Sequence, residues 1–406
     1  MNLSYFIAKR ISFKKTGGFT GTIHRIAVAS IALGLSIMII SFLILGGFQS
    51  VISNKVFSFT GHFQVNRFVM SQSLEDSPTS TTSDFYTNYK ESDYIRHVQV
   101  FANKPALIKG EEEVEGVMMK GVGRDFDSLA FKSSIVKGRF IQFPENGRSS
   151  NEIVVSTKIA RKMLLDIGSK VTMYFVQDPP RFRRLEVVGL YETFLEDFDD
   201  KFVLGDVRVI QVLNDWDEDK VGGFEVFIND PENIDAYEDE LYESIDYDLR
   251  LTKVTDRFIQ IFDWLELLNN NVYVFLALIL FVASFNMVSI LFILIMERTS
   301  MIGLLKAMGS SNRQIRNIFI WNGIRIISRG MLLGNLIGLG FGLLQQTTHL
   351  FKLNAENYYM SYVPIVWDWP IIFGLNLLIL MITTLVLFIP AVIISNVNPI
   401  KSIKFD

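Results

Sequence analysis

Four long apolar blocks dominate the sequence, and the first of them, Ile26–Phe48, contains no charged residue. A membrane-spanning helix needs about 20 consecutive apolar residues. The blocks Val272–Met296 and Pro370–Ser395 also reach this length, whereas Gly330–Leu344 is shorter and follows a stretch that contains two arginines. Arginine side chains can reach the membrane surface from such a position. The sequence therefore predicts four membrane helices, the first of which is too long for a cleavable signal and stays as an anchor.

The basic residues predict the orientation of these helices, because Lys and Arg collect on the cytoplasmic side. Residues 1–25 contain five basic and no acidic residues, and residues 297–329 contain six basic residues and one acidic residue. Both segments and the C-terminal tail are therefore expected in the cytoplasm. Residues 51–271 contain 25 basic and 39 acidic residues. That segment is expected outside, and its charge argues against binding to nucleic acid.

The predicted fold class is an α-helical integral membrane protein with four transmembrane helices and an α+β periplasmic domain inserted between the first and second spans. Alternating residues predict strands in that domain, and helices are expected at 156–165 and 233–245. Residues 71–83 are expected to form an exposed loop, and residues 254–296 one continuous helix. The strands are expected at 62–68, 95–108, 115–122, 169–176, 185–191 and 224–228.

The predicted segments follow one another without gaps. They are an amphipathic cytoplasmic N-terminus (1–25), the first membrane helix (26–50), the periplasmic domain (51–254), a stalk continuing into the second membrane helix (255–296), a cytoplasmic coupling segment (297–314), the third membrane helix (315–347), a short periplasmic loop (348–369), the fourth membrane helix (370–396) and a cytoplasmic tail (397–406).

One hairpin of the periplasmic domain has an unusual tip. Two predicted strands flank a Pro-Pro turn with a Phe and several Arg residues, and the candidate docking residues are Gln177, Asp178, Pro179, Pro180, Arg181, Phe182 and Arg183. Turns favour proline and charge, so an ordinary solvated hairpin explains the composition. Arg and aromatic residues also anchor protein interfaces, and a basic tip on an acidic domain suits a partner selected by charge.

A short amphipathic helix is expected directly after the second span. Gly309 is placed to end it, and Ser310 or Ser311 to begin the next helix. By its pattern alone this is a helix at the inner membrane surface. The candidate coupling residues in it are Glu297, Arg298, Ile302, Gly303, Leu305, Lys306, Met308 and Gly309.

This segment resembles the E-R-x-x-x-I-G-x-L-K-A-x-G motif of the FtsX and MacB superfamily of ABC transporter permeases. The resemblance implies that it is the coupling helix, which enters a groove on a separate ATPase, and we expect Ile302, Leu305 and Met308 to face that groove. The family usually has Glu before Ile-Gly, where this chain has Met301. A salt bridge from that position is therefore not expected.

Further segments are similar to the permeases of Lol-type lipoprotein-releasing transporters. They are Phe6–Arg10, Ile31–Gly34, Gly46–Gln49, Tyr358–Ile365 and Asn398–Ile403. This resemblance implies two copies of a cytoplasmic ATPase, a second permease chain that is identical or homologous, and a lipoprotein substrate. It also implies a periplasmic lipoprotein carrier, which is captured by a hairpin at the position of Gln177–Arg184. It also implies membrane lipids as partners.

Such a subunit would be a non-catalytic part of an ATP-hydrolysing transport complex. The chain has no G-x-x-x-x-G-K-[ST] motif, so ATP and Mg are expected on the partner ATPase and no cofactor or metal on this chain. The four histidines have no metal-ligand spacing, and no catalytic residue is expected. Met38, Phe42, Leu43 and Phe48 are candidates for an acyl-chain cavity, although a spanning helix needs such residues for lipid contact or packing in any case.

Two other functions are compatible with the same motifs. An FtsX-like permease would control a cell-wall hydrolase, and a MacB-like permease would drive efflux by mechanotransmission. The first type has a shorter outer domain and the second usually carries its ATPase on the same chain, so both are less suited to this sequence.

The orientation can be tested by labelling, because the chain contains no cysteine. A membrane-impermeant thiol reagent applied to spheroplasts should label Ser77→Cys but not Ser310→Cys, since only the acidic segment is expected outside. The reverse labelling pattern would refute the predicted topology.

Overall fold

The computed structural model describes residues 19–69, 75–110, 113–145 and 147–389, and the chain divides into two compact units. The helical unit comprises the chain up to Ser50, Trp264–Leu353 and the chain from Tyr362, and the α/β unit comprises Val51–Asp263 and Asn354–Ser361. In chain order, the described strands follow helix α2 and precede helix α10. Most of the predicted N-terminal segment and all of the predicted tail lie outside the described residues.

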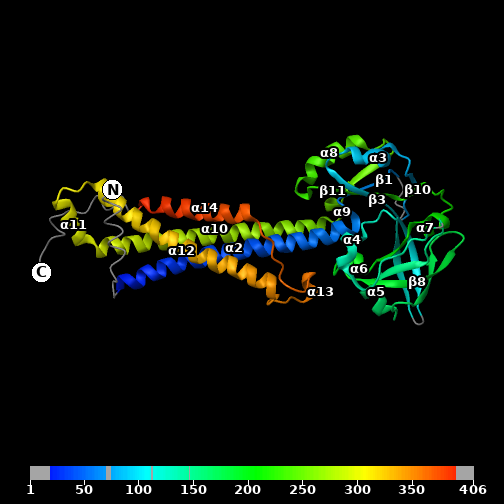
Figure 1. The fold of residues 1–406 in the computed structure, drawn as a ribbon, viewed down its shortest axis with the longest axis horizontal. Helices are drawn as coiled ribbons and strands as arrows, with labels where there is room; N and C mark the ends of the chain where they lie inside the picture. Colours follow the sequence, from blue (N-terminus) through cyan, green and yellow to red (C-terminus); the bar gives the residue numbers. More distant parts are fainter. Residues whose placement is uncertain (1–18, 70–74, 111–112, 146, 390–406) are drawn as a thin grey trace. The chain divides into compact units, whose positions relative to one another are not determined.

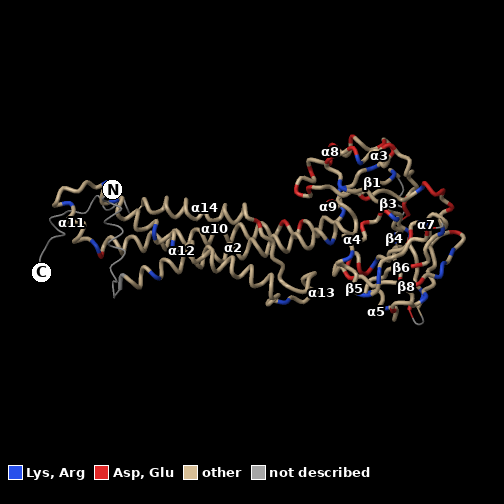
Figure 2. Tube along the Cα trace, viewed as in Figure 1, with Lys and Arg blue, Asp and Glu red and all other residues tan. Residues whose placement is uncertain are grey.

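In the part of the helical unit that the structure describes, four helices are long and apolar enough to cross a membrane. They lie side by side in Figure 1 and agree with the four predicted spans within the described residues. A short helix, α11 (Thr299–Ala307), connects two of them, and the basic residues of the unit gather near it (Figure 2). The long helices are α2 (Phe19–Thr60), α10 (Ile259–Glu297), α12 (Asn312–Thr348) and α14 (Trp369–Val386).

A row of glycines allows α12 to pack closely against α2. Gly330, Gly334, Gly338 and Gly342 recur every fourth residue and lie on one face of α12. A Cβ atom at any of them would come within about 3 Å of α2, for example 2.9 Å from the carbonyl oxygen of Ala32 at Gly334. Small residues at helix contacts are how membrane helices gain van der Waals packing, because burial from lipid provides no hydrophobic driving force.

Two pairs of polar side chains join neighbouring helices of the helical unit. The amides of Asn335 on α12 and Asn376 on α14 exchange two hydrogen bonds of 2.7 and 3.0 Å. Asn286 on α10 donates to the hydroxyl of Ser30 on α2 at 2.5 Å. Such pairs satisfy groups that find no water in a bilayer, and they connect each of these helices to a specific neighbour.

Within its described residues, the α/β unit is built on a mixed sheet of ten strands. Six of them close a ring, since β3 pairs with β4, β4 with β9, β9 with β6, β6 with β8, β8 with β7, and β7 again with β3. The strands β11, β1 and β12 extend the sheet from β3, and β5 extends it from β8. Two further strands, β2 and β10, form a separate pair. The bounds are β1 (Phe63–Arg67), β2 (Thr79–Ser80), β3 (Ile95–Lys109), β4 (Val114–Val122), β5 (Ile135–Gly138), β6 (Glu152–Ser156), β7 (Lys170–Phe175), β8 (Arg181–Tyr191), β9 (Phe202–Asp206), β10 (Lys220–Val221), β11 (Gly223–Ile228) and β12 (Leu249–Lys253).

Short helices cover this sheet, and one apolar cluster packs around the end of α2. In that cluster Phe59 contacts the rings of Phe131, Tyr191 and Phe198. The amine of Lys55 on α2 donates to the carbonyl oxygens of Thr193 and Tyr359, at 2.8 and 2.6 Å, and so holds segment 354–361 within the α/β unit. The helices are α3 (Asp84–Asn88), α4 (Ser128–Phe131), α5 (Thr157–Lys162), α6 (Glu196–Asp199), α7 (Val207–Leu213), α8 (Ile234–Ser244), α9 (Val254–Arg257) and α13 (Ala355–Tyr358).

The structure confirms the predicted strands and both predicted helices of this unit within a few residues and corrects two other expectations. The expected loop at 71–83 contains strand β2, whose Thr79 is buried and pairs with Val221. The expected continuous helix from residue 254 is interrupted at Phe258, which has φ −110° and ψ 40° and separates α9 from α10.

The glycine row predicts where the helical unit tolerates a larger side chain. Gly334→Leu should lower the thermal unfolding temperature of the purified protein, because overpacking costs about 1–3 kcal/mol or more. Gly340→Leu is the matched control, since a Cβ atom at Gly340 on the same helix meets no atom within 4 Å. Equal effects of the two substitutions would show that α12 does not depend on the glycine row for its packing.

Candidate functional site

The segment around α11 has sharply defined ends. Helix α10 ends at Glu297, and Arg298 is the N-cap residue of α11. Gly309 follows α11 with a φ of 88°, a left-handed conformation in which glycine carries no steric penalty. The next helix, α12, begins with a capping box in which Ser311 and Gln314 exchange side-chain hydrogen bonds with each other's backbone. The predicted helix stop at Gly309 and the predicted Ser cap are therefore confirmed.

The two faces of α11 differ from the predicted assignment. Ile302 is completely buried among this chain's own apolar side chains, including Ile315 and Phe319, and Leu305 packs partly against the same cluster. Ile302 therefore has no surface open to a partner, which corrects its assignment to an ATPase groove, whereas Leu305 is half-buried and its assignment stays a prediction. The exposed apolar residues are Leu304 and Met308, which are 57% and 66% exposed.

The predicted docking hairpin is present, and part of it is anchored to the domain. The strands β7 and β8 flank the turn 176–180, so Arg181, Phe182 and Arg183 lie in a strand rather than in the turn. The Arg181 guanidinium forms two hydrogen bonds with Asp215, of 3.0 and 2.7 Å, and also donates to the carbonyl oxygen of Leu213. The amide of Gln177 donates to the same carbonyl oxygen. Arg181 and Gln177 thus hold the hairpin in place and do not form its free surface.

An exposed apolar row crosses this hairpin and the neighbouring strand. Leu107 on β3 lies opposite Tyr174 on β7, which lies opposite Phe182 on β8. Directly opposite residues share one face of a sheet, and the rings of Tyr174 and Phe182 are 6.0 Å apart. The three side chains are 41%, 40% and 62% exposed. We call Leu107, Tyr174 and Phe182 the apolar row; only Phe182 was predicted, because the other two become its neighbours through strand pairing.

The four candidate cavity residues lie on α2 in two different environments. Met38 and Leu43 are buried among the helices of this chain, and Leu43 lies against Gly342. Phe42 and Phe48 are half-buried, with ring contacts to Tyr273 and Trp264 on α10, each at 6.2 Å. Phe42 and Phe48 are therefore the members of this set with surface left for a ligand.

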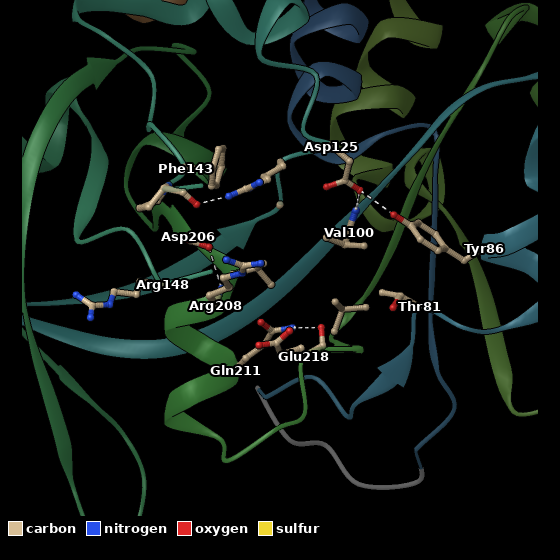
Figure 3. Close-up of a pocket in the computed structure, with 15 residues that line it drawn as sticks. Thr81, Tyr86, Val100, Asp125, Phe143, Arg148, Asp206, Arg208, Gln211 and Glu218 are labelled. Carbon is tan, nitrogen blue, oxygen red and sulfur yellow. Dashed lines mark hydrogen bonds between the residues drawn. The ribbon is translucent and has the colours of Figure 1, made fainter. Parts of the chain in front are cut away.

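A pocket of about 310 Å³ opens within the α/β unit, between β3, α7 and the loops after β4 and β5 (Figure 3). Its charged lining consists of three arginines and three acids. Asp125 accepts hydrogen bonds from the backbone amide of Val100 and the hydroxyl of Tyr86, and burial raises the pKa of its carboxyl. These bonds hold Asp125 as part of the wall, and Asp206 likewise accepts hydrogen bonds from the backbone amides of Ser150 and Arg208. The charged residues are Arg124, Arg148, Arg208, Asp125, Asp206 and Glu218.

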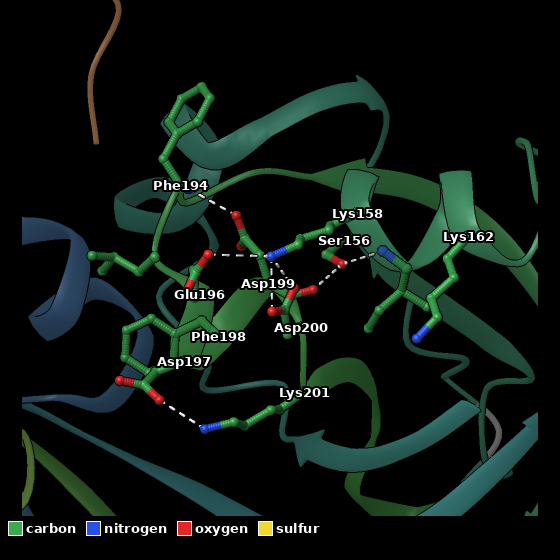
Figure 4. A network of polar contacts seen from close by, with 12 residues as sticks. Ser156, Lys158, Lys162, Phe194, Glu196, Asp197, Phe198, Asp199, Asp200 and Lys201 are labelled. Carbon is green, nitrogen blue, oxygen red and sulfur yellow. Dashed lines mark hydrogen bonds and ion pairs between the residues drawn. The ribbon is translucent and has the colours of Figure 1, made fainter. Parts of the chain in front are cut away.

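An acidic segment, residues 192–200, is held by ion pairs and backbone bonds (Figure 4). Lys158 pairs with Glu196 and Asp200, and Lys201 pairs with Asp197. The Asp199 carboxylate accepts hydrogen bonds from the backbone amides of Thr193 and Phe194, although burial raises its pKa. The segment is thus a structural cluster, and no group of three His, Asp or Glu residues in the described part of the chain is placed to hold a metal ion.

Comparison with known proteins covers both units. Residues 26–243 match the family model of the MacB-like periplasmic core domain, and residues 273–399 match that of the FtsX-like permease C-terminal region. The chain is 24% identical to the lipoprotein-releasing system transmembrane protein LolC of Neisseria meningitidis over 86% of both chains. It is 21% identical to the transmembrane protein LolE of the same system in Haemophilus influenzae over 96% of this chain and 95% of that protein. The solved periplasmic region of MacB from Actinobacillus actinomycetemcomitans is similar at 12% identity and a TM-score of 0.36, over 50% of this chain and 92% of its own.

Four apolar helices together with a mixed α/β unit define a multi-pass membrane protein of the permease class. Because one family model covers more than half of the chain and a second covers most of the remainder, the chain belongs to the FtsX and MacB superfamily of ABC transporter permeases.

Proposed function

We propose that this chain is the permease subunit of a transporter that extracts lipoproteins from the outer leaflet of the bacterial inner membrane and passes them to a periplasmic carrier. The observation that carries this proposal is the similarity to two lipoprotein-releasing transmembrane proteins, which extends over at least 86% of each chain and includes both units. A permease that shared only the membrane helices would not match across the α/β unit.

The proposed arrangement places the α/β unit in the periplasm, inserted between the first and second spans, with both termini in the cytoplasm. Two copies of a separate ATPase bind ATP and Mg below the membrane, and a second permease chain, identical or homologous, completes the complex. Support for this orientation comes from the basic residues near α11 and the acidic excess of residues 51–271.

Extraction needs energy because each acyl CH₂ group holds a lipoprotein in the membrane by about 0.8 kcal/mol, so three chains contribute on the order of tens of kcal/mol. An apolar surface on the permease lowers this cost by receiving the chains as they leave the bilayer. Phe42 and Phe48 are the best placed of the four candidates, since each is half-buried and faces an aromatic residue of α10. Met38 and Leu43 are buried among the helices of this chain and would support such a surface through packing.

The exposed face of α11 is the proposed contact with the ATPase. Leu304 and Met308 supply exposed apolar area, and Glu297, Arg298, Gly303, Lys306 and Gly309 define the ends and the surroundings of the helix. Because Ile302 anchors the opposite face in this chain's own core, force on α11 reaches α10 and α12 directly.

Substitutions of the adjacent residues Leu304 and Leu305 test coupling to the ATPase and folding of this chain separately. Leu304→Glu should abolish ATPase co-purification and ATP-driven lipoprotein release in proteoliposomes, because an unpaired charge would enter an apolar contact. The unfolding temperature should not change. Leu305→Ala is the control. It removes packing within this chain, so its main effect should be a lower unfolding temperature.

Two results would contradict these proposals. Normal release by the Leu304→Glu complex would place the ATPase contact elsewhere. A wild-type complex that hydrolyses ATP but transfers no acylated lipoprotein to a soluble carrier would refute lipoprotein release itself.

The apolar row is the proposed docking surface for the carrier. Central aromatic anchors of an interface typically contribute about 2 kcal/mol or more each, which corresponds to roughly 30-fold in Kd. The anchoring of the hairpin by Arg181 and Gln177 keeps these side chains in a fixed arrangement, which reduces the entropy lost on binding.

Replacement of both rings tests this docking surface. Tyr174→Ala with Phe182→Ala should weaken carrier binding in a calorimetric titration by at least roughly 30-fold, while ATPase assembly is retained. Tyr242→Ala is the matched control, because Tyr242 is an aromatic residue on α8 that is 67% exposed and lies outside the row. Equal carrier affinity of the double variant and the wild type would exclude the row as the docking surface.

A further inference from the structure

A buried ion pair lies in the α/β unit beside the end of α2. Lys120 on β4 and Glu225 on β11 are 2% and 0% exposed, and the amine nitrogen is 2.6 Å from the carboxylate. The amides of Gln64 and Gln99 donate to the two carboxylate oxygens of Glu225 at 3.1 and 2.8 Å. Gln64 and Gln99 lie directly opposite Glu225 on its two neighbouring strands. The carboxylate is therefore fully enclosed by donors from three strands.

The lysine of this pair also caps the first long helix. The amine of Lys120 donates to the carbonyl oxygen of Phe59 in the last turn of α2 and lies 4.7 Å above the Phe59 ring. The last four carbonyl groups of an α-helix have no partner within the helix, and a positive charge near them is favourable. Lys120 thus provides the end of α2 with a partner that belongs to the sheet.

The same network reaches the second helix that leads out of the α/β unit. Arg257 on α9 donates to the side-chain oxygen of Gln64, whose amide nitrogen in turn donates to Glu225. After the interruption at Phe258, the chain continues from α9 into α10. One continuous set of hydrogen bonds therefore joins the end of α2, the four strands β1, β3, β4 and β11, and α9.

Stability alone does not explain buried charges at this place. Burial lowers the pKa of Lys120, an effect that Glu225 opposes, so keeping the amine charged has an energetic cost. Apolar residues of similar size are often equally stable or more stable in such positions. A fully satisfied polar network differs from them in that it specifies a single geometry, because each bond has a direction.

We propose that Lys120, Glu225, Gln64 and Arg257 form a joint that fixes the angle at which α2 and α9 meet the sheet, and that these are positioning residues for transport. This role rests on the proposed function, because helix movements driven by the ATPase must reach the carrier-docking surface. A loose joint would let the helices move without moving the sheet.

The joint is tested in the full-length protein in nanodiscs with spin labels at Asn54→Cys on α2 and Tyr242→Cys on α8, both of which are exposed. Lys120→Met with Glu225→Gln removes both charges and leaves one amide oxygen in place of two carboxylate oxygens, so Gln64 and Gln99, which donate to different oxygens of Glu225, cannot both keep their acceptor. The distance distribution between the labels should broaden. In the assembled transporter, ATP hydrolysis should continue while the lipoprotein released per ATP falls severalfold.

The matched control is Lys104→Met. Lys104 is also buried, at 1% exposure, and pairs with Glu75 at 2.9 Å, but it makes no hydrogen bond to α2 or α9. Broadening in this control, or an unchanged distribution in the Lys120 and Glu225 variant, would overturn the proposal.

A second variant covers the case in which the double variant does not fold. Arg257→Gln leaves the buried pair intact and cuts only the bond to α9, so it should also broaden the distribution if the labels are placed at Asp263→Cys and Tyr242→Cys. A narrow distribution in this variant would overturn the proposal. The distance measurement needs no substrate, so it tests the joint even if the wild-type complex releases no lipoprotein.

Discussion

The contact between α2 and α12 sets the spacing of the helical unit. Apolar side chains gain little by leaving lipid for protein, so membrane helices associate where their backbones can approach closely. The glycines at 330, 334, 338 and 342 provide such a surface on α12, and the side chains of α2 fill it. The other long helices then add specific polar bonds, Asn286 with Ser30 and Asn335 with Asn376, and leave their remaining apolar faces exposed for lipid.

The helix α11 and the β7–β8 hairpin, the two candidate contact elements, each have one set of side chains bound to this chain and another set exposed. On α11, Ile302 is buried in the chain's own core, while Leu304 and Met308 remain exposed. On the hairpin, Arg181 is bound to Asp215 and Leu213, while Phe182 remains exposed. A surface that must bind a partner repeatedly benefits from such anchoring, because its side chains are already ordered before the partner arrives.

The sequence predicted the helices and strands of this fold better than it predicted which residues of different elements lie next to one another. Apolar length and charge located the four long helices, and the Gly309 stop and Ser cap could be predicted because single residues carry those signals. The interruption at Phe258 could not, since no Gly or Pro marks it. Periodicity predicted that α11 is amphipathic but not which of its apolar residues face inward, because Ile302 and Leu304 are both branched apolar residues and only the packing of the chain buries one and exposes the other. Leu107 and Tyr174 become neighbours of Phe182 only through the pairing of β3, β7 and β8.

The hydrogen bond from Lys120 to the last turn of α2 also has a consequence for the order in which the chain folds. Phe59 and Lys120 are 61 residues apart in the chain, and Lys120 and Glu225 are 105 residues apart. Contacts of such separation form late, after the intervening chain has been made and its loops closed. The first long helix can therefore enter the membrane during synthesis, but its last turn stays without its partner until strands β4 and β11 have paired with their neighbours. Completion of the last turn of the first long helix is thus a folding event of the α/β unit.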